Sequence, residues 1–419
     1  MKLALALIAA FALPVFAQED KAEKSDKDSP YEQIKLLSTA IEMIRQNYVD
    51  EAKIGYQKLM RAALRGMLQS LDPHSQFMEP TSFEDMKEDT ESRFGGLGLH
   101  VTERDGDLII VAPMEDSPSF RAGILPGDQI IKINGQSTER MGISDAFEKL
   151  RGTVGTKVTL TILRPGTKEI KEFELVRENI KVWSVKDAKM LPPGMSGESK
   201  IGYARITQFN APTAEELAKK LDELEKQGMQ AFILDLRFNP GGLINSAVDV
   251  AGMFLPPATV VCTTEGRVAS QSRKYTANPA LRRRANYPLA VLINFGSASG
   301  SELAAGALKD TNRAIIVGET SFGKGSVQSI MPLPDGSAVR LTTAKYYTPS
   351  HNLIHEHGIA PTIRAGMTSE QERQLMVSRR ENLTEEQRKK DLSGFRDTQL
   401  ERAVDSLKGV LVYRERTGN

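Results

Sequence analysis

The sequence contains a single cysteine and a single tryptophan, and its formal net charge is only +1 over 419 residues. One cysteine cannot form an intrachain disulfide, so a disulfide-stapled scaffold is excluded. Cys262 lies in an apolar stretch, where a buried structural thiol is expected rather than a catalytic one. The 55 basic and 54 acidic residues balance, so no overall field attracts nucleic acid or an anionic membrane.

No stable membrane span is expected. The apolar run at residues 3–16 is too short to cross a bilayer comfortably. It follows Lys2, ends before the small residue Ala17 and precedes the polar residues 18–20, which is typical of a cleavable signal peptide. We therefore predict a signal peptide over residues 1–17 and a protein exported to the periplasm or another extracytoplasmic compartment. An uncleaved N-terminal anchor is the alternative.

The length indicates two or three domains, and composition and periodicity divide the chain further. Residues 18–30 are charged or small and predict a linker, while apolar residues at helical spacing predict two amphipathic helices within 31–92. Short β-branched runs between glycines and prolines predict a compact, mostly β module over 93–178. Strands alternate with helices over 179–366, which predicts an α/β core of parallel βαβ units. The charged, helical region 367–419 is expected to be solvated or used in assembly.

The run GSASGSE at residues 296–302 follows an apolar strand and precedes a predicted helix. Ligands bind beyond the carboxyl ends of parallel strands in open α/β sheets, so Ser299 lies where a nucleophile would act. The same residues match a helix capping box, in which the hydroxyl would only satisfy a backbone amide. Ser297 and Ser301 are rival nucleophiles within the run, and this motif alone does not decide among these readings.

Lys324, in the run FGKG at 322–325, is the candidate base. The five histidines form no recognisable triad motif, and a lysine can activate a serine once its own charge is removed. Its pKa of about 10.4 would have to fall by roughly 3 units, a cost of about 4 kcal/mol, which burial can supply. Gln328, four residues further on, has an amide that can orient the lysine or the serine.

Two other readings of this region are weaker. Residues 318–324 fit the first seven positions of the phosphate-binding pattern G-x-x-x-x-G-K, but Gly325 replaces the required serine or threonine. The following residues 326–331 predict a strand, whereas a phosphate loop opens a helix. The histidines within 351–357 lie in a loop without carboxylates at an obvious helical spacing, so no metal site is expected.

The turn NPGG at 239–242 ends one predicted strand and opens a helix. It is either an ordinary turn or a source of free amides that hold an oxyanion, with the Gly300 amide as a second donor.

The loop FGGLGL at 94–99 is glycine-rich and runs into a strand of the β module. Its amides can turn toward a carboxylate while the strand edge accepts an extended peptide, which together would capture a free C-terminus. A glycine hairpin is the alternative, but the glycine-rich runs at 122–128 and 131–135 favour a peptide-binding module. The candidate contacts are Gly96, Leu97, Gly98 and Leu99.

Taken together, these motifs resemble the carboxyl-terminal processing proteases, or tail-specific proteases, of serine peptidase family S41. Residues 121–135 resemble the central signature of a PDZ domain, and residues 235–242, 297–299 and 322–325 resemble the protease core. The similarity extends from about residue 31 to residue 363, and the motifs occur in the family's order.

The resemblance implies a ClpP/crotonase-like α/β core with an inserted PDZ domain that binds the substrate tail and gates activity. It implies a serine endopeptidase that cleaves exported proteins near their C-terminus without metal or cofactor. Ser299 would be the nucleophile, Lys324 the base and Gln328 the supporting residue. The expected partners are proteins or peptides with apolar C-terminal tails and an adaptor or activator. The terminal helices predict association with a second copy of the chain, and the balanced charge predicts no binding to nucleic acid. A non-catalytic PDZ scaffold that presents tails to another protease is the alternative.

The resemblance also assigns further residues. The oxyanion donors map to the amides of Gly242 and Gly300, and Arg164 matches an arginine that helps to align the active site in some members. Two positions depart from the family pattern: Gly300 replaces the usual alanine, and Thr362 replaces a common aspartate.

Overall fold

The computed structural model describes residues 29–417 apart from short gaps, which are residues 92, 105, 115–116, 126, 140, 142, 166–167, 285, 380–384 and 387–390. The predicted signal peptide and all but the last two residues of the predicted linker therefore lie outside the described residues. Within the described residues, no helix is both long and apolar enough to span a membrane. The chain divides into two compact units, residues 1–70 and 71–419.

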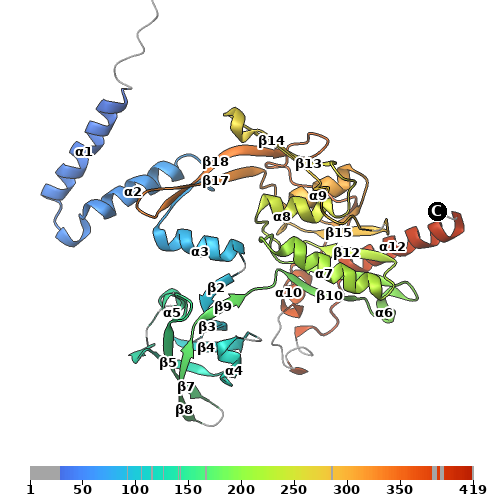
Figure 1. Ribbon diagram of the computed structural model, residues 1–419, viewed down its shortest axis with the longest axis horizontal. Helices are drawn as coiled ribbons and strands as arrows, with labels where there is room; N and C mark the ends of the chain where they lie inside the picture. Colours follow the sequence, from blue (N-terminus) through green and yellow to red (C-terminus); the bar gives the residue numbers. More distant parts are fainter. Residues whose placement is uncertain are drawn as a thin grey trace, which may run out of the picture. The chain divides into compact units, whose positions relative to one another are not determined.

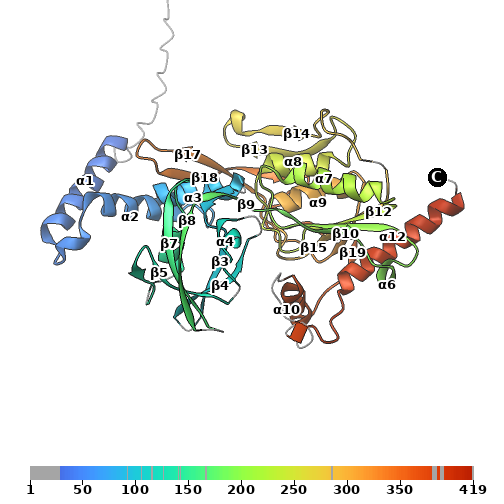
Figure 2. The ribbon, with the colours of Figure 1, turned by 60° about the horizontal axis from the view of Figure 1, so that its bottom comes forward.

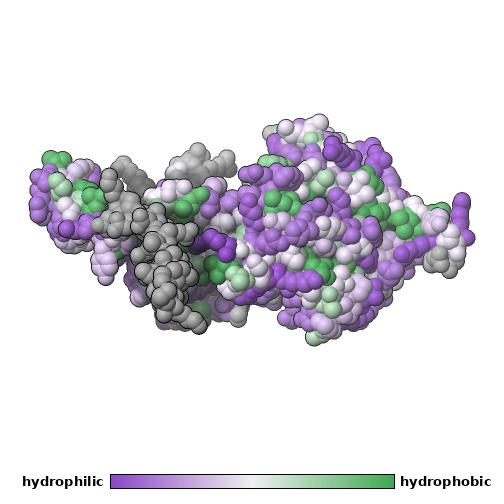
Figure 3. Space-filling model, turned by 90° about the horizontal axis from the view of Figure 1, so that it is seen from above, coloured by the Kyte–Doolittle hydropathy of each residue, from purple (hydrophilic) through white to green (hydrophobic). Residues whose placement is uncertain are grey.

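The first unit contains the two expected amphipathic helices, α1 (Pro30–Asn47) and α2 (Tyr56–Gln69), joined through the short 3-10 helix η2 (Glu51–Lys53) (Figure 1). Few of their apolar side chains are buried, and Figure 3 shows green patches on this helical pair. The exposed large apolar residues include Tyr31, Ile34, Leu36, Met43, Val49, Tyr56 and Met67. Among the described residues of this unit, these side chains form an apolar surface.

The β module is an antiparallel sheet with the order β3-β4-β5-β7-β8, in which β6 also pairs with β5. Its core is built from alternating residues of these strands, such as Ile110, Ile130 and Leu160, which are almost fully buried. Its elements are β3 (Leu99–Arg104), β4 (Asp107–Pro113), α4 (Pro118–Arg121), β5 (Gln129–Ile133), β6 (Gln136–Ser137), α5 (Ile143–Leu150), β7 (Lys157–Arg164) and β8 (Glu169–Val176).

A two-stranded antiparallel ribbon joins the two ends of this module. Its strands are β2 (Arg93–Gly96) and β9 (Glu178–Lys181). Because the chain enters and leaves the module side by side, the module is inserted between helix α3 (Pro80–Glu91) and the sheet that follows.

The α/β core contains a six-stranded sheet with the order β10-β11-β12-β15-β16-β19. All neighbouring strands are parallel except β10 and β11. The expected parallel βαβ units are therefore present. The strands are β10 (Val185–Met190), β11 (Ile201–Ile206), β12 (Ala231–Asp235), β15 (Leu289–Ile293), β16 (Ile315–Gly318) and β19 (Ile363–Arg364).

Helices cover both faces of this sheet (Figure 2). Phe232 and Leu234 of β12 pack against α7 (Thr213–Lys226), α8 (Ile244–Gly252) and α9 (Gly300–Asp310). Ala231 and Ile233 face the opposite side, because successive strand residues alternate between faces. All five residues of β12 are consequently buried, as its continuous apolar sequence predicts.

The C-terminal helix α12 (Thr398–Thr417) covers this opposite face. Val404 and Leu407, on the predicted apolar stripe, are buried against the sheet of the same chain. The interpretation of the region as solvated or reserved for assembly is therefore wrong for this stripe, which belongs to the core. Two further helices among the described residues of the core are α6 (Pro193–Ser196) and α10 (Ser369–Ser378).

A second, antiparallel sheet is organised around the long strand β18 (Ala338–Tyr347). The order is β1-β18-β13-β14, and β17 (Ser326–Pro332) also pairs with β18. The predicted strand at 326–331 is thus confirmed, and the loop before it does not open a helix, which removes the phosphate-loop reading. The other elements are β1 (Gln76–Met78), β13 (Val260–Gly266), η3 (Ala269–Gln271) and β14 (Arg273–Thr276).

Cys262 lies on β13 and is fully buried, as predicted. Burial raises the pKa of its thiol to about 12, which keeps it protonated and unreactive.

Candidate active site

The hydroxyls of the two rival serines, Ser297 and Ser301, are held in hydrogen bonds to the backbone. Ser297 Oγ donates to the Leu236 carbonyl (2.8 Å) and accepts from the Asn294 amide (3.0 Å). Ser301 Oγ donates to the Asn239 carbonyl (2.9 Å). Both residues are fully buried and tie the turn after β15 to the turn after β12. Neither hydroxyl is available to attack a substrate.

Ser299, between these two serines, differs from them in its backbone conformation and in its hydroxyl. Its φ of 51° falls in the left-handed region that residues other than glycine seldom adopt, which is a form of backbone strain found at functional turns. Its carbonyl accepts from the amides of Glu302 (2.9 Å) and Leu303 (3.0 Å), so α9 begins here. Its own hydroxyl makes no capping hydrogen bond. The turn therefore presents an uncommitted hydroxyl at the carboxyl end of a parallel strand.

Glu302 connects this turn to the loop that carries Lys324. Its fully buried carboxylate accepts from the amides of Ser299 (2.7 Å) and Lys324 (2.9 Å) at Oε2. At Oε1 it accepts from the Gly323 amide and the Ser321 hydroxyl, both at 2.6 Å. Burial raises the pKa of Glu302, although these four hydrogen bonds oppose the rise. Sequence reasoning treated Glu302 only as a capping residue, whereas its carboxylate joins two loops.

Lys324 is half-buried. Burial lowers the pKa of its ammonium, the positive charge of Arg340 lowers it further, and Glu302 opposes both. A Cβ on the following Gly325 would lie 2.1 Å from the His355 amide, so only glycine permits this close packing. The loop that carries Lys324 therefore packs directly against the backbone at residue 355.

Gln328 lies on β17 beside Lys324's loop. Its Nε2 donates to Ser326 Oγ (2.9 Å) and more distantly to Thr342 Oγ1 (3.5 Å). Among the described residues, no hydrogen bond joins the side chains of Ser299, Lys324 and Gln328. The segments that carry the three predicted residues therefore lie together, but the three side chains are not hydrogen-bonded to one another.

The glycine turn lies against the serine turn. A Cβ on Gly241 would lie 2.7 Å from the Gly300 nitrogen and from the Ser299 Cβ, and its φ is 101°. In the part of the chain that the structure describes, the amides of Gly242 and Gly300 donate to no acceptor. A methyl group at Gly300 would lie 3.2 Å from the Phe209 ring, which gives a steric reason for glycine at this position.

Comparisons with known proteins identify the family of the chain. Residues 200–365 match the model of peptidase family S41, residues 109–164 match a PDZ domain, and residues 11–82 match the N-terminal domain of the activating protease CtpB. The carboxy-terminal-processing protease of Bartonella bacilliformis is 39% identical over 343 residues, which cover 81% of this chain and 76% of that one. The chain belongs to peptidase family S41, the carboxy-terminal processing serine proteases.

Other members of the family give the same picture. The carboxy-terminal processing protease CtpB of Bacillus subtilis is 37% identical over 353 residues, which cover 84% of this chain and 70% of that one. A putative S41 protease from Bacteroides fragilis has the same fold, with a TM-score of 0.52 at 17% identity over 88% of this chain and 97% of that chain.

In this S41 protease, the predicted tail-binding loop borders a cavity of about 250 Å³ in the PDZ domain. Strand β3 is at the edge of its sheet, so its outer side is open to an added strand. Three of the four predicted contacts line the cavity, whereas Gly96 lies in β2. The lining residues are Leu97, Gly98, Leu99, Val101, Met114, Phe147, Leu150, Arg151 and Val182.

Arg164 is engaged inside the PDZ domain. Its Nε and Nη2 donate to the two oxygens of Asp128 at 2.9 and 2.8 Å, and Nη2 also donates to the Gly123 carbonyl at 3.2 Å. Its hydrogen bonds to described residues all lie within the PDZ domain.

A buried charge cluster supports the end of β12. Arg237 is fully buried and pairs with Asp235 (2.8 Å) and with Asp397 (2.8 Å), which follows 160 positions later. Asp235 also accepts from Arg379 (2.6 Å) and from the Tyr203 hydroxyl (2.7 Å). Burial acts to raise the pKa of Asp235, but the charges of Arg237 and Arg379 hold it well below its usual range. The C-terminal region thus completes the turn that precedes the glycines.

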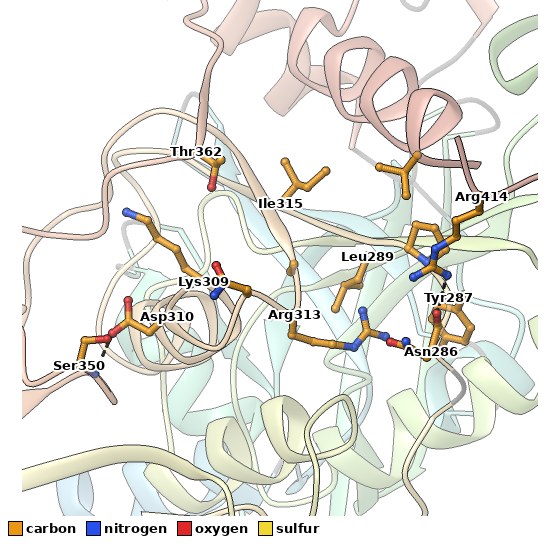
Figure 4. A pocket seen from close by; sticks show the side chains of 14 residues that line it. Asn286, Tyr287, Leu289, Lys309, Asp310, Arg313, Ile315, Ser350, Thr362 and Arg414 are labelled. Atoms are coloured by element: carbon orange, nitrogen blue, oxygen red, sulfur yellow. Dashed lines mark hydrogen bonds between the residues drawn. The ribbon is translucent and has the colours of Figure 1, made fainter. Parts of the chain in front are cut away.

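A larger cavity, of about 750 Å³, is not the active site (Figure 4). Its lining includes Leu289 and Ile315, the first residues of β15 and β16, together with Arg313 and Arg414. It therefore lies at the amino ends of these strands, whereas Ser299 follows the carboxyl end of β15.

Glu302→Gln should disable the site. A glutamine has only one acceptor oxygen, so its NH₂ group would face two of the four donors, at about 1–3 kcal/mol for each donor left unsatisfied. We expect cleavage of a peptide substrate to slow by at least about 100-fold. The variant Glu319→Gln, at a partly buried carboxylate after β16, is the matched control. Wild-type turnover in Glu302→Gln would contradict a joining role for Glu302.

Proposed function

We propose that this protease is a Ser-Lys endopeptidase that cleaves exported proteins near their C-terminus. The observation that carries the proposal is the shared acceptor: one buried oxygen of Glu302 accepts from the amides of both Ser299 and Lys324. Two loops that are separated in the sequence are thereby fixed side by side, one with an uncommitted hydroxyl and the other with an amine of lowered pKa.

In the proposed reaction, neutral Lys324 takes the proton of Ser299 Oγ as this oxygen bonds to the scissile carbonyl carbon. The amides of Gly242 and Gly300 would hold the resulting oxyanion. The C–N bond then breaks, and the leaving amine takes the proton from Lys324. Water next loses a proton to Lys324 and attacks the acyl carbon, and Ser299 leaves with that proton. Gln328 would orient the lysine during both steps.

The PDZ domain would bind the substrate tail. An extended C-terminus would add to the open edge of β3 and place its apolar side chain in the cavity beside Leu99 and Phe147. Arg151, which sequence reasoning overlooked, lines the same cavity and is paired with Asp85 of α3 (3.7 Å). We assign this role to residues 93–178 and catalysis to residues 179–366, completed by the C-terminal helices.

We further propose that tail binding gates the enzyme, because the side chains of Ser299 and Lys324 have to close on each other before attack. Arg164, an adaptor or an activator would contribute to this closure. The exposed apolar residues of α1 and α2 support association with a second copy of the chain. Export by the predicted signal peptide would place the enzyme outside the cytoplasm.

The proposal is tested with a model protein that carries an apolar C-terminal tail. Mass spectrometry should locate a cut near the C-terminus, and a fluorophosphonate probe should label Ser299. A substrate with an amidated C-terminus should be cut at least about 10-fold more slowly, because it lacks the recognised carboxylate. Tail binding without cleavage or labelling would instead indicate a non-catalytic scaffold, and equal cleavage of both substrates would remove the tail-binding role.

A further inference from the structure

We propose that Asp72, in the loop 72–75 that precedes β1, is a positioning residue for Gln328. This inference rests on the proposed role of Gln328 at the active site. It extends the catalytic assembly to a segment that lies before the PDZ domain in the sequence.

The Asp72 carboxylate accepts hydrogen bonds both from its own loop and from strand β18. Oδ1 accepts from the amides of His74 (2.7 Å) and Ser75 (2.8 Å), and Oδ2 accepts from Ser75 Oγ (2.7 Å). Oδ1 also accepts from the Thr342 hydroxyl on β18 at 3.2 Å. Burial acts to raise the pKa of Asp72, but these hydrogen bonds outweigh it and lower the pKa, so the carboxylate is ionised and can only accept.

The direction of these bonds determines how Gln328 is held. Thr342 and Gln328 are paired in the register of β18 and β17, at a bulge after Val327. Because the Thr342 hydroxyl donates its proton to Asp72, it can only accept from Gln328, whose Nε2 lies 3.5 Å away. The NH₂ group of Gln328 is therefore directed toward Thr342 and Ser326. Its carbonyl oxygen is left to accept from Lys324, which would aim the lone pair of the neutral amine at Ser299.

The loop is fixed beside the base by further contacts. The Thr342 amide donates to Ser75 Oγ (3.1 Å), and Arg340 Nε donates to the His74 carbonyl (3.3 Å). Strand β1 then pairs with β18, with Gln76 opposite Arg340. Burial lowers the pKa of His74, and the positive charge of Lys324 lowers it further.

The experiment measures kcat and KM with a short internal peptide that does not require the PDZ domain. Asp72→Ala and Thr342→Val should each lower kcat about 10-fold with little change in KM, because the first removes the acceptor of the Thr342 hydroxyl and the second removes the hydroxyl itself. Thr342→Ser retains the hydroxyl and should restore kcat. Glu84→Gln, at an exposed carboxylate of α3, is the matched control, and thermal unfolding of each variant reports the folded fraction.

A double-mutant cycle separates positioning from general structural support. In a Gln328→Ala background, Asp72→Ala and Thr342→Val should have no further effect on kcat. The inference would be overturned if the double variants lost kcat by the product of the two single-variant factors, or if Thr342→Ser were as slow as Thr342→Val. The proposed function would remain intact in both cases. Wild-type kcat in Gln328→Ala would instead overturn the proposed role of Gln328, and this inference with it.

Discussion

Replacing Ser299 with alanine should abolish cleavage, with kcat lowered by about 10⁴-fold or more, and should leave the stability of the fold nearly unchanged. The catalytic loss is large because no other hydroxyl of the run is available. The structural cost is small because the Ser299 hydroxyl makes no capping bond, while its backbone contacts with Glu302 persist in alanine. Cleavage of a tailed substrate and thermal unfolding measure the two effects.

The neighbouring serines provide the matched controls. Ser297→Ala and Ser301→Ala each remove a buried hydrogen bond and should destabilise the protein by about 1–3 kcal/mol. Neither should lose the ability to be labelled by a serine-reactive probe. Turnover retained in Ser299→Ala, together with labelling lost in Ser301→Ala, would transfer the nucleophile to Ser301.

Replacing Lys324 should have the second largest effect. Both Lys324→Ala and Lys324→Arg should lower kcat by about 10³-fold or more, since an arginine cannot be deprotonated in a protein. In the wild type only the neutral lysine is active, so the rate should rise with pH through the pKa of Lys324. Because burial and Arg340 lower that pKa, the rise should occur below the pKa of an ordinary lysine, about 10.4.

The Arg340→Gln variant tests this sign. Removing the positive neighbour should raise the pKa of Lys324 and shift the rising limb of the pH–rate profile to higher pH. The control is Arg282→Gln, an exposed arginine paired with carboxylates of α7, which should leave the profile unchanged. An unshifted limb in Arg340→Gln, or an active Lys324→Arg, would exclude Lys324 as the base.

Local patterns predicted much of the fold. Helical periodicity located α1 and α2, and the continuous apolar run at 231–236 predicted a strand buried on both faces. The prediction for the charged segment after residue 366 was partly wrong. Its charged residues indicate which side of the helix faces solvent, but the burial of Leu407 depends on a sheet whose strands lie much earlier in the sequence. A stripe of four apolar residues does not specify whether the same chain or another covers it.

The site could be predicted only in part for a similar reason. The motifs singled out Ser299 and Lys324, but three serines in one short run are equivalent until the backbone directs each hydroxyl. The roles of Glu302 and Asp72 arise from contacts that cross 22 and 270 positions of the sequence. A single sequence carries no signal for such pairs beyond the acidic residue itself.

The pairing of Arg237 with Asp397 has a consequence for the order in which the enzyme matures. The arginine stands immediately before the glycine turn, yet its second carboxylate belongs to the last 23 residues of the chain. Because a buried guanidinium without its counter-charges is costly, the turn should become fully stable only after the segment that carries Asp397 has folded against it. A chain that lacks Asp397 should therefore hold the turn before the glycines less firmly.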